Sequence, residues 1–97
     1  MEQATITITD PIGLHARPAA LLVRTVGQYQ AQVRLEYGSK RASARSILQL
    51  LSLGVRLGSE VTVIAEGIDA VDALAAALAV LTAVPEAPES PVAAGEL

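Results

Sequence analysis

The sequence predicts a small α+β domain in which three helices cover one face of an antiparallel β-sheet. Three segments show the alternation of apolar and polar residues that is typical of half-buried strands, a fourth follows a hairpin turn signal, and three others repeat apolar residues with a helical period. Their order is strand, helix, strand, strand, helix, strand, helix. A chain of 97 residues is too short for a doubly wound fold, so we expect two layers. The pattern alone does not separate the ferredoxin-like strand order from others.

The first half of the chain predicts a helix between two strands, followed by a return strand. Isoleucines and threonines alternate over residues 5–8, which indicates the first strand. An Ala/Leu/Val-rich run predicts a helix over residues 16–26. Alternation over residues 31–37 predicts the second strand. Gly38-Ser39 is a two-residue turn signal, so residues 40–43 should return beside that strand as a hairpin.

A second, short helix should begin after Ser46. The serine side chain can accept a hydrogen bond from a first-turn N–H, and Gly54 can close the helix in a left-handed conformation. Leu48 does not lie on the apolar stripe and is expected to be exposed. Three side chains at helical spacing are expected to face the core: Ile47, Leu50 and Leu51.

The remaining elements are a fourth strand and a third helix. Valine and alanine alternate over residues 61–65, which predicts the strand. Asp69 and Asp72 make an acidic helix start, where negative charge is favourable. Four apolar residues then carry this helix with a helical period: Val71, Leu74, Leu78 and Leu81.

Composition restricts the classes of function. The chain is 52% hydrophobic but has two tyrosines and no Phe or Trp, so the core must be aliphatic. It has no cysteine and one histidine, which excludes disulfides and argues against a metal site or a zinc cofactor. Residues 1–84 carry seven acids and seven bases, so nucleic acid is not expected as a partner. No apolar run approaches a membrane span and no signal segment opens the chain; a cytoplasmic protein is expected.

Residues 85–97 are expected to lie outside the folded domain, which we place at residues 1–84. This stretch is rich in Pro, Ala and Glu and has no periodicity, as in a flexible tail or linker. Two interpretations stay open: the joint to a following module of a larger fusion protein, or a C-terminal extension without function.

The single histidine, His15, lies where the first strand gives way to the first helix. Gly13 permits a sharp turn into that helix, and Pro18 fits its first turn, where a missing N–H costs no bond. His15 should therefore lie at or next to the N-cap, with unpaired N–H groups and Arg17 nearby. A helix N-terminus beside a guanidinium favours anions. This arrangement indicates an imidazole that itself carries a phosphoryl group.

Two stretches carry a resemblance to a known family. Residues 13–19, Gly-Leu-His-Ala-Arg-Pro-Ala, resemble the active-site signature of HPr, the histidine phosphocarrier of the sugar phosphotransferase system. Residues 46–54, Ser-Ile-Leu-Gln-Leu-Leu-Ser-Leu-Gly, resemble the second HPr signature, a serine that opens a short apolar helix. The resemblance implies an open-faced β-sandwich: a four-stranded antiparallel sheet ordered 1-4-2-3 with three helices on one face. The tail would then match multiphosphoryl-transfer fusions, in which an HPr domain precedes enzyme I.

The resemblance also implies a function. Phospho-enzyme I, charged by phosphoenolpyruvate, would transfer its phosphoryl group to Nδ1 of His15, and a sugar-specific enzyme IIA would receive it. Arg17 would neutralise the phosphoryl oxygens, and the N–H groups of Ala16 and Arg17 would point at them. Such a protein is a carrier that acts only together with enzyme I and enzyme II partners. It needs no cofactor and is expected to be a monomer.

A carrier must bind two partners weakly, which requires an apolar rim around His15. The candidate rim residues are Leu14, Ala20, Leu48 and Leu51, although packing in the core is the alternative for Leu48 and certain for part of Leu51. Arg24 and Arg45 would steer acidic partners. Two positions depart from common family patterns: Ile12, where a small polar residue often caps the active-site loop, and Gln49, where glycine is frequent.

Ser46 is expected to cap its helix, and the resemblance adds a regulatory role. In the family, an HPr kinase of Gram-positive bacteria phosphorylates the matching serine, although many members carry the serine without that kinase. Two other classes of function are alternatives. A regulatory binding module that acts through its phosphorylation state is the alternative to sugar transport. An enzyme with His15 as acid or base is disfavoured, because the sequence shows no carboxylate partner for it.

Overall fold

The computed structural model describes residues 1–83, which form one four-stranded antiparallel sheet. Its strands are β1 (Glu2–Thr7), β2 (Gln32–Tyr37), β3 (Lys40–Ser43) and β4 (Glu60–Glu66). They lie in the order β1-β4-β2-β3, so the predicted 1-4-2-3 order is confirmed. The predicted boundary at residue 84 and the predicted tail over residues 85–97 lie outside the described residues.

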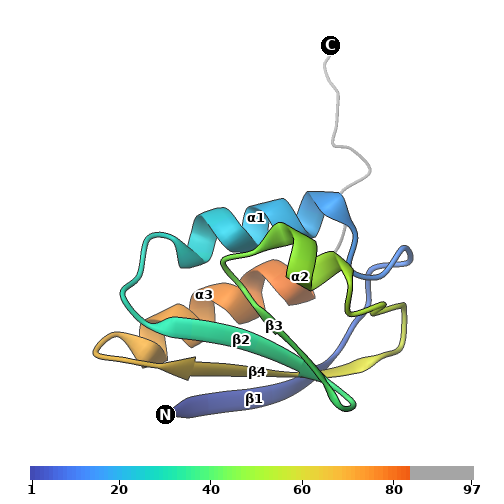
Figure 1. The fold of residues 1–97 in the computed structure, drawn as a ribbon. Helices are drawn as coiled ribbons and strands as arrows, with labels where there is room; N and C mark the ends of the chain where they lie inside the picture. Colours follow the sequence, from blue (N-terminus) through green and yellow to red (C-terminus); the bar gives the residue numbers. More distant parts are fainter. Residues whose placement is uncertain (84–97) are drawn as a thin grey trace.

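Three helices lie on one face of this sheet (Figure 1), as predicted. They are α1 (Ala16–Val26), α2 (Ile47–Leu51) and α3 (Ala70–Thr82). In Figure 1, α1 and α3 run side by side over the sheet, and the shorter α2 lies beside α1 near β3. Within residues 1–83, no helix lies on the opposite face of the sheet.

The aliphatic core lies between the sheet and the helices. In the register of β4, Val61 pairs with Ile6 of β1, and Val63 pairs with Leu35 of β2. Because alternate strand residues face opposite sides, this register places their side chains in one layer under the helices. The largest fully buried side chains are all aliphatic: Leu22, Leu35, Leu50, Leu53, Val26, Val61 and Val63.

The predicted hairpin between β2 and β3 is confirmed. Tyr37 pairs with Lys40, so Gly38 and Ser39 form the two-residue turn between them. Gly38 has a φ of 61°, a conformation that glycine adopts without steric cost.

The predicted core faces of α2 and α3 were partly wrong. In α2 only Leu50 is fully buried, whereas Ile47 and Leu51 are 40% and 37% exposed. This helix has only five residues, so a single side chain, rather than an i, i+3, i+4 stripe, reaches the core. In α3 Val71 is exposed, because it lies one residue, or about 100° of helix rotation, from the buried stripe that starts at Ala70. The buried face of α3 is Ala70, Ala73, Ala77 and Leu81.

Asp69 lies at the N-cap of α3, but its side chain does not cap that helix. Its carboxylate instead accepts hydrogen bonds from the backbone N–H of Gln30 at 2.9 Å and of Ala31 at 2.8 Å. The bond from Gln30, with a further contribution from Ala31, holds the pKa of Asp69 below its usual value. Asp69 therefore ties the start of α3 to the loop that joins α1 and β2.

Candidate functional site

The loop between β1 and α1 presents His15. Its first turn is closed by Asp10, whose carbonyl accepts from the Gly13 N–H at 2.9 Å. The Oδ1 atom of Asp10 accepts from the Ile12 N–H, also at 2.9 Å. Next, the Leu14 N–H donates to the carbonyl of Val55 at 3.1 Å. These bonds fix the loop on both sides of the residue that turns the chain into α1.

Gly13 is that residue. Its φ is 84°, a region that side-chain-bearing residues rarely enter. A Cβ placed there would also collide with the backbone of the neighbouring loop, at 2.7 Å from the Cα of Arg56. The predicted need for glycine at the turn is confirmed, and close packing adds a second reason for it.

His15 is the N-cap residue of α1, as predicted. Its backbone is extended and its side chain makes no capping hydrogen bond, while its carbonyl accepts from the Ala19 N–H at 3.0 Å. Within residues 1–83, the N–H groups of Ala16 and Arg17 have no hydrogen-bond acceptor. The side chain of Arg17 is exposed, and no carboxylate in residues 1–83 lies within ion-pair distance of it. These donors can receive an anion held next to the imidazole.

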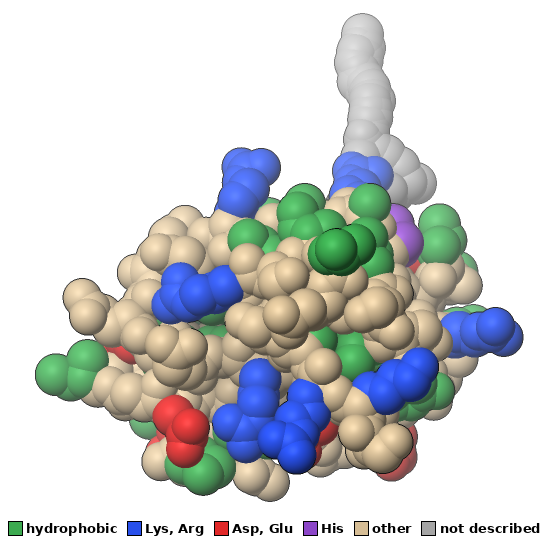
Figure 2. Space-filling view, viewed as in Figure 1, with side chains coloured by type: hydrophobic (Ala, Val, Ile, Leu, Met, Phe, Trp, Pro, Cys, Tyr) green, Lys and Arg blue, Asp and Glu red, His purple; other side chains and the backbone are tan. Residues whose placement is uncertain are grey.

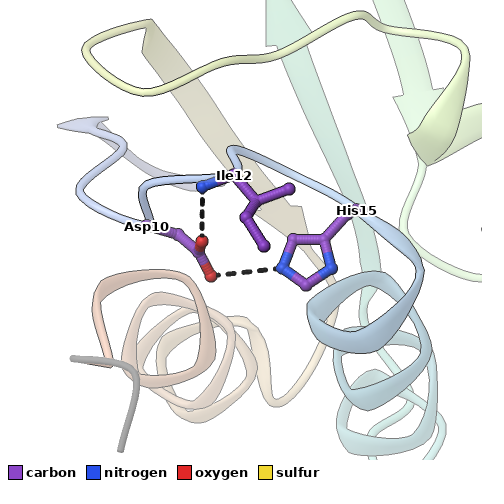
Figure 3. A network of polar contacts seen from close by, with 3 residues as sticks. All are labelled: Asp10, Ile12 and His15. Atoms are coloured by element: carbon purple, nitrogen blue, oxygen red, sulfur yellow. Dashed lines mark hydrogen bonds and ion pairs between the residues drawn. The ribbon is translucent and has the colours of Figure 1, made fainter. Parts of the chain in front are cut away.

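The sequence analysis missed one residue of the site, Asp10. Its Oδ2 atom lies 3.4 Å from Nε2 of His15 (Figure 3), so the expectation that His15 has no carboxylate partner was wrong. The two side chains are 22% and 30% exposed, respectively. Asp10 and His15 are five residues apart in a loop that contains Pro11 and Gly13, so no periodic pattern links them. The available signal was the turn itself, because an Asp at the start of a turn often accepts a hydrogen bond from the backbone N–H two residues later.

The apolar rim is only partly as predicted. Leu48 is 79% exposed and Leu51 is 37% exposed, so both are accessible to a partner, and Ala20 is half-buried. Leu14 was wrong as a rim residue: it is 8% exposed and packs in the core, because its backbone is bonded to the Val55 segment. Figure 2 shows apolar side chains gathered on the same side of the molecule as the histidine. The predicted rim did not include two exposed apolar side chains close to His15 along the chain, Ile12 in the loop before it and Leu21 on α1.

The two steering arginines differ in their surroundings. Arg24 lies exposed in the last turn of α1. The guanidinium of Arg45 donates to the carbonyls of Tyr29 at 2.9 Å and Ala31 at 3.1 Å. These carbonyls follow the C-terminal end of α1, about 16 Å along the helix from His15. Arg45 is therefore a structural bridge at the far end of α1, and its role in steering acidic partners stays a prediction.

Ser46 is the N-cap of α2, as predicted. Its Oγ atom accepts from the Gln49 N–H at 3.2 Å. The side chain of Gln49 has a structural contact of its own, since its Oε1 atom accepts from the Ser43 N–H at 2.9 Å and joins α2 to β3. Gln49, which stands where glycine is frequent in the family, thus anchors α2 to β3.

Two further properties concern the described part of the chain. Residues 1–83 contain no group of three or more His, Cys, Asp or Glu side chains placed to hold a metal ion. None of the helices there combines the length and the hydropathy that crossing a bilayer requires.

Comparisons with known proteins show the family of this chain. The family model for the PTS HPr component phosphorylation site matches residues 2–83. HPr-C-His from Thermoanaerobacter tengcongensis is 41% identical, with a TM-score of 0.79 over 84% of this chain and 91% of that chain. The phosphocarrier protein HPr from Bacillus anthracis is 36% identical, with a TM-score of 0.78 over 84% of this chain and 96% of that chain.

Fold and site together define a phosphocarrier protein rather than an enzyme. Within that class, the chain belongs to the HPr family of the phosphotransferase system. Relatives differ in assembly: Crh, the catabolite repression protein from Bacillus subtilis, forms an intertwined dimer with a swapped domain. Crh is 41% identical to this chain, with a TM-score of 0.68 over 84% of this chain and 93% of that chain. The monomeric state expected from the sequence therefore stays a prediction.

Proposed function

We propose that this chain accepts a phosphoryl group on His15 from phospho-enzyme I and passes it to a sugar-specific enzyme IIA. One observation carries the proposal: the imidazole lies at the N-cap of α1, beside N–H groups that have no acceptor within residues 1–83. An imidazole that does not cap its helix leaves these donors free for the phosphoryl group that it would carry.

Each group at the helix N-terminus has a role in transfer. Nδ1 of His15 attacks the phosphorus of the donor's phosphohistidine. The N–H groups of Ala16 and Arg17, with the Arg17 guanidinium, balance the charge on the phosphoryl oxygens. Pro18 keeps the first turn in helical geometry without competing as a donor. Such transfer needs positioning and charge balance from the protein, and no cofactor has a role in it.

Docking would use the exposed apolar side chains near His15. Leu48, Leu51 and Ala20 supply a small contact area, and Ile12 and Leu21 extend it. A small apolar contact suits a carrier that must release each partner. Arg24 would steer acidic partners, and the interaction would take place in the cytoplasm.

Regulation through Ser46 is the second proposal. Ser46 is only partly buried and lies at the start of α2, two residues before the exposed Leu48 and five before Leu51, so a kinase such as an HPr kinase could reach its hydroxyl. The similarity to Crh, a catabolite repression protein, supports the alternative function: a binding module that acts through its phosphorylation state.

Incubation with phosphoenolpyruvate and an enzyme I, followed by intact-mass measurement, tests the main proposal. One phosphoryl group should be added, lost in mild acid and retained in base, as is expected of a phosphoramidate. His15→Ala should fold normally and accept nothing. Labelling of the His15→Ala variant would show that another residue is the acceptor.

A further inference from the structure

We propose that Asp10 is the positioning residue of this site: it holds the His15 ring with the proton on Nε2, so that Nδ1 is the free nucleophile. The inference rests on the proposed phosphoryl transfer and adds to it a residue that selects the reactive tautomer. Three features support it: the anchoring of Asp10, the atoms that face each other, and the charge that forms during transfer.

Asp10 is held in place by hydrogen bonds that do not involve the histidine. Its carbonyl accepts from Gly13 N–H and its Oδ1 accepts from Ile12 N–H, both at 2.9 Å. Rotation of the carboxylate would break the bond to Ile12. The second oxygen, Oδ2, is therefore held toward the imidazole, as Figure 3 shows.

The facing atoms determine the tautomer. A carboxylate only accepts hydrogen bonds, so the ring nitrogen that faces it, Nε2 at 3.4 Å, is the one that carries the proton. A neutral imidazole has one N–H, and Nδ1 then keeps its lone pair. Figure 3 places Nδ1 on the side of the ring nearer the first turn of α1. The lone pair is thus on the side of the unpaired N–H groups of Ala16 and Arg17.

The charge balance of transfer favours the same arrangement. The Nδ1 lone pair forms the new N–P bond, and the electron pair of the donor's N–P bond returns to the donor's imidazole. The His15 ring, still protonated at Nε2, becomes cationic at this step. The Asp10 carboxylate stabilises that cation from the side away from the phosphoryl group, while Arg17 faces the phosphoryl oxygens. The negative carboxylate of Asp10 thus lies beside the cationic ring, and the positive guanidinium of Arg17 lies beside the negative phosphoryl group.

The first test reads the tautomer of the unphosphorylated protein. Nitrogen-15 NMR of the wild-type ring, at a pH where it is neutral, should show Nε2 protonated and Nδ1 unprotonated. A predominantly Nδ1-protonated ring would overturn the inference, without any labelling experiment. This readout does not depend on enzyme I, so it separates a failure of the Asp10 role from a failure of the proposed function.

The second test is Asp10→Asn. The Asn carbonyl can still accept from Ile12 N–H, but the amide nitrogen, a donor, then faces Nε2 and favours the opposite tautomer. Phosphoryl uptake from enzyme I should slow by roughly two- to tenfold, as expected for losing a partly exposed charged hydrogen bond in the transition state.

Asp72→Asn is the matched control, because it removes the same charge from an exposed position in the first turn of α3. It should keep the wild-type tautomer and rate. If Asp10→Asn also keeps both, Asp10 does not position the ring. If both variants slow uptake equally, net charge is the cause and the inference is again wrong.

Discussion

Replacing Ser46 separates its effect on stability from its effect on recognition. The Oγ atom accepts from the Gln49 N–H at 3.2 Å at the start of a helix of five residues, in which only Leu50 is fully buried. With so little packing behind it, the helix depends strongly on this cap. Ser46→Ala should therefore cost about 1 kcal/mol, within the usual 0.5–2 kcal/mol for a lost cap. In a domain of this size, that lowers Tm by about 4–8 °C.

Ser46→Asp should behave differently. The aspartate can still accept from the first-turn N–H and places a negative charge where it is favourable, so Tm should stay unchanged or rise slightly. The same charge lies beside the exposed apolar side chains of α2. If enzyme I presents acidic groups to Arg17 and Arg24, repulsion should weaken binding and slow labelling of His15, and added salt should reduce the difference.

Melting temperature and enzyme I-dependent labelling are measured on the same three proteins: wild type, Ser46→Ala and Ser46→Asp. The alanine variant should be less stable but labelled at the normal rate; the aspartate variant should be stable but labelled slowly at low salt. A destabilised aspartate variant would refute the capping argument. Normal labelling of that variant at low salt would show that the α2 surface does not meet enzyme I.

Two further predictions concern charged side chains. Arg17→Ala should slow transfer by about 10- to 150-fold, which corresponds to losing roughly 1.5–3 kcal/mol of charge-assisted bonding in the transition state; unchanged stopped-flow or quench kinetics would leave the backbone N–H groups as the only stabilising donors. Asp69→Asn should lower Tm at pH 7, since an amide cannot accept from both Gln30 and Ala31. Because the pKa of Asp69 is lowered from 3.8 by folding, its contribution is present above that pH and is lost as pH falls through the folded value. Thermal melts from pH 7 to pH 2 should therefore show the Tm values of wild type and Asp69→Asn converging in acid. A Tm difference that stays constant over this range would contradict the role of the ionised Asp69 carboxylate.

Much of the fold and the centre of the site could be predicted from the sequence, because they depend on contacts between near neighbours. Alternation identified three strands and helical periods identified the three helices, since the side-chain direction repeats every two or 3.6 residues. The Gly38-Ser39 turn signal identified the remaining strand. His15 and Ser46 were placed correctly as N-caps, because a cap concerns only the next turn of the helix. Gly13 was identified from the sharp turn that its position requires. The strand order came from the family resemblance rather than from any pattern.

Tertiary structure decided what each side chain meets. Asp69 bonds to backbone 38 and 39 residues away instead of capping α3. Arg45 is held at the far end of α1, and Leu14 is drawn into the core. Asp10 meets His15 across a loop that the Leu14–Val55 hydrogen bond joins to another part of the chain. Periodicity records which way a side chain points from its own element, but its partner depends on where the other elements come to lie.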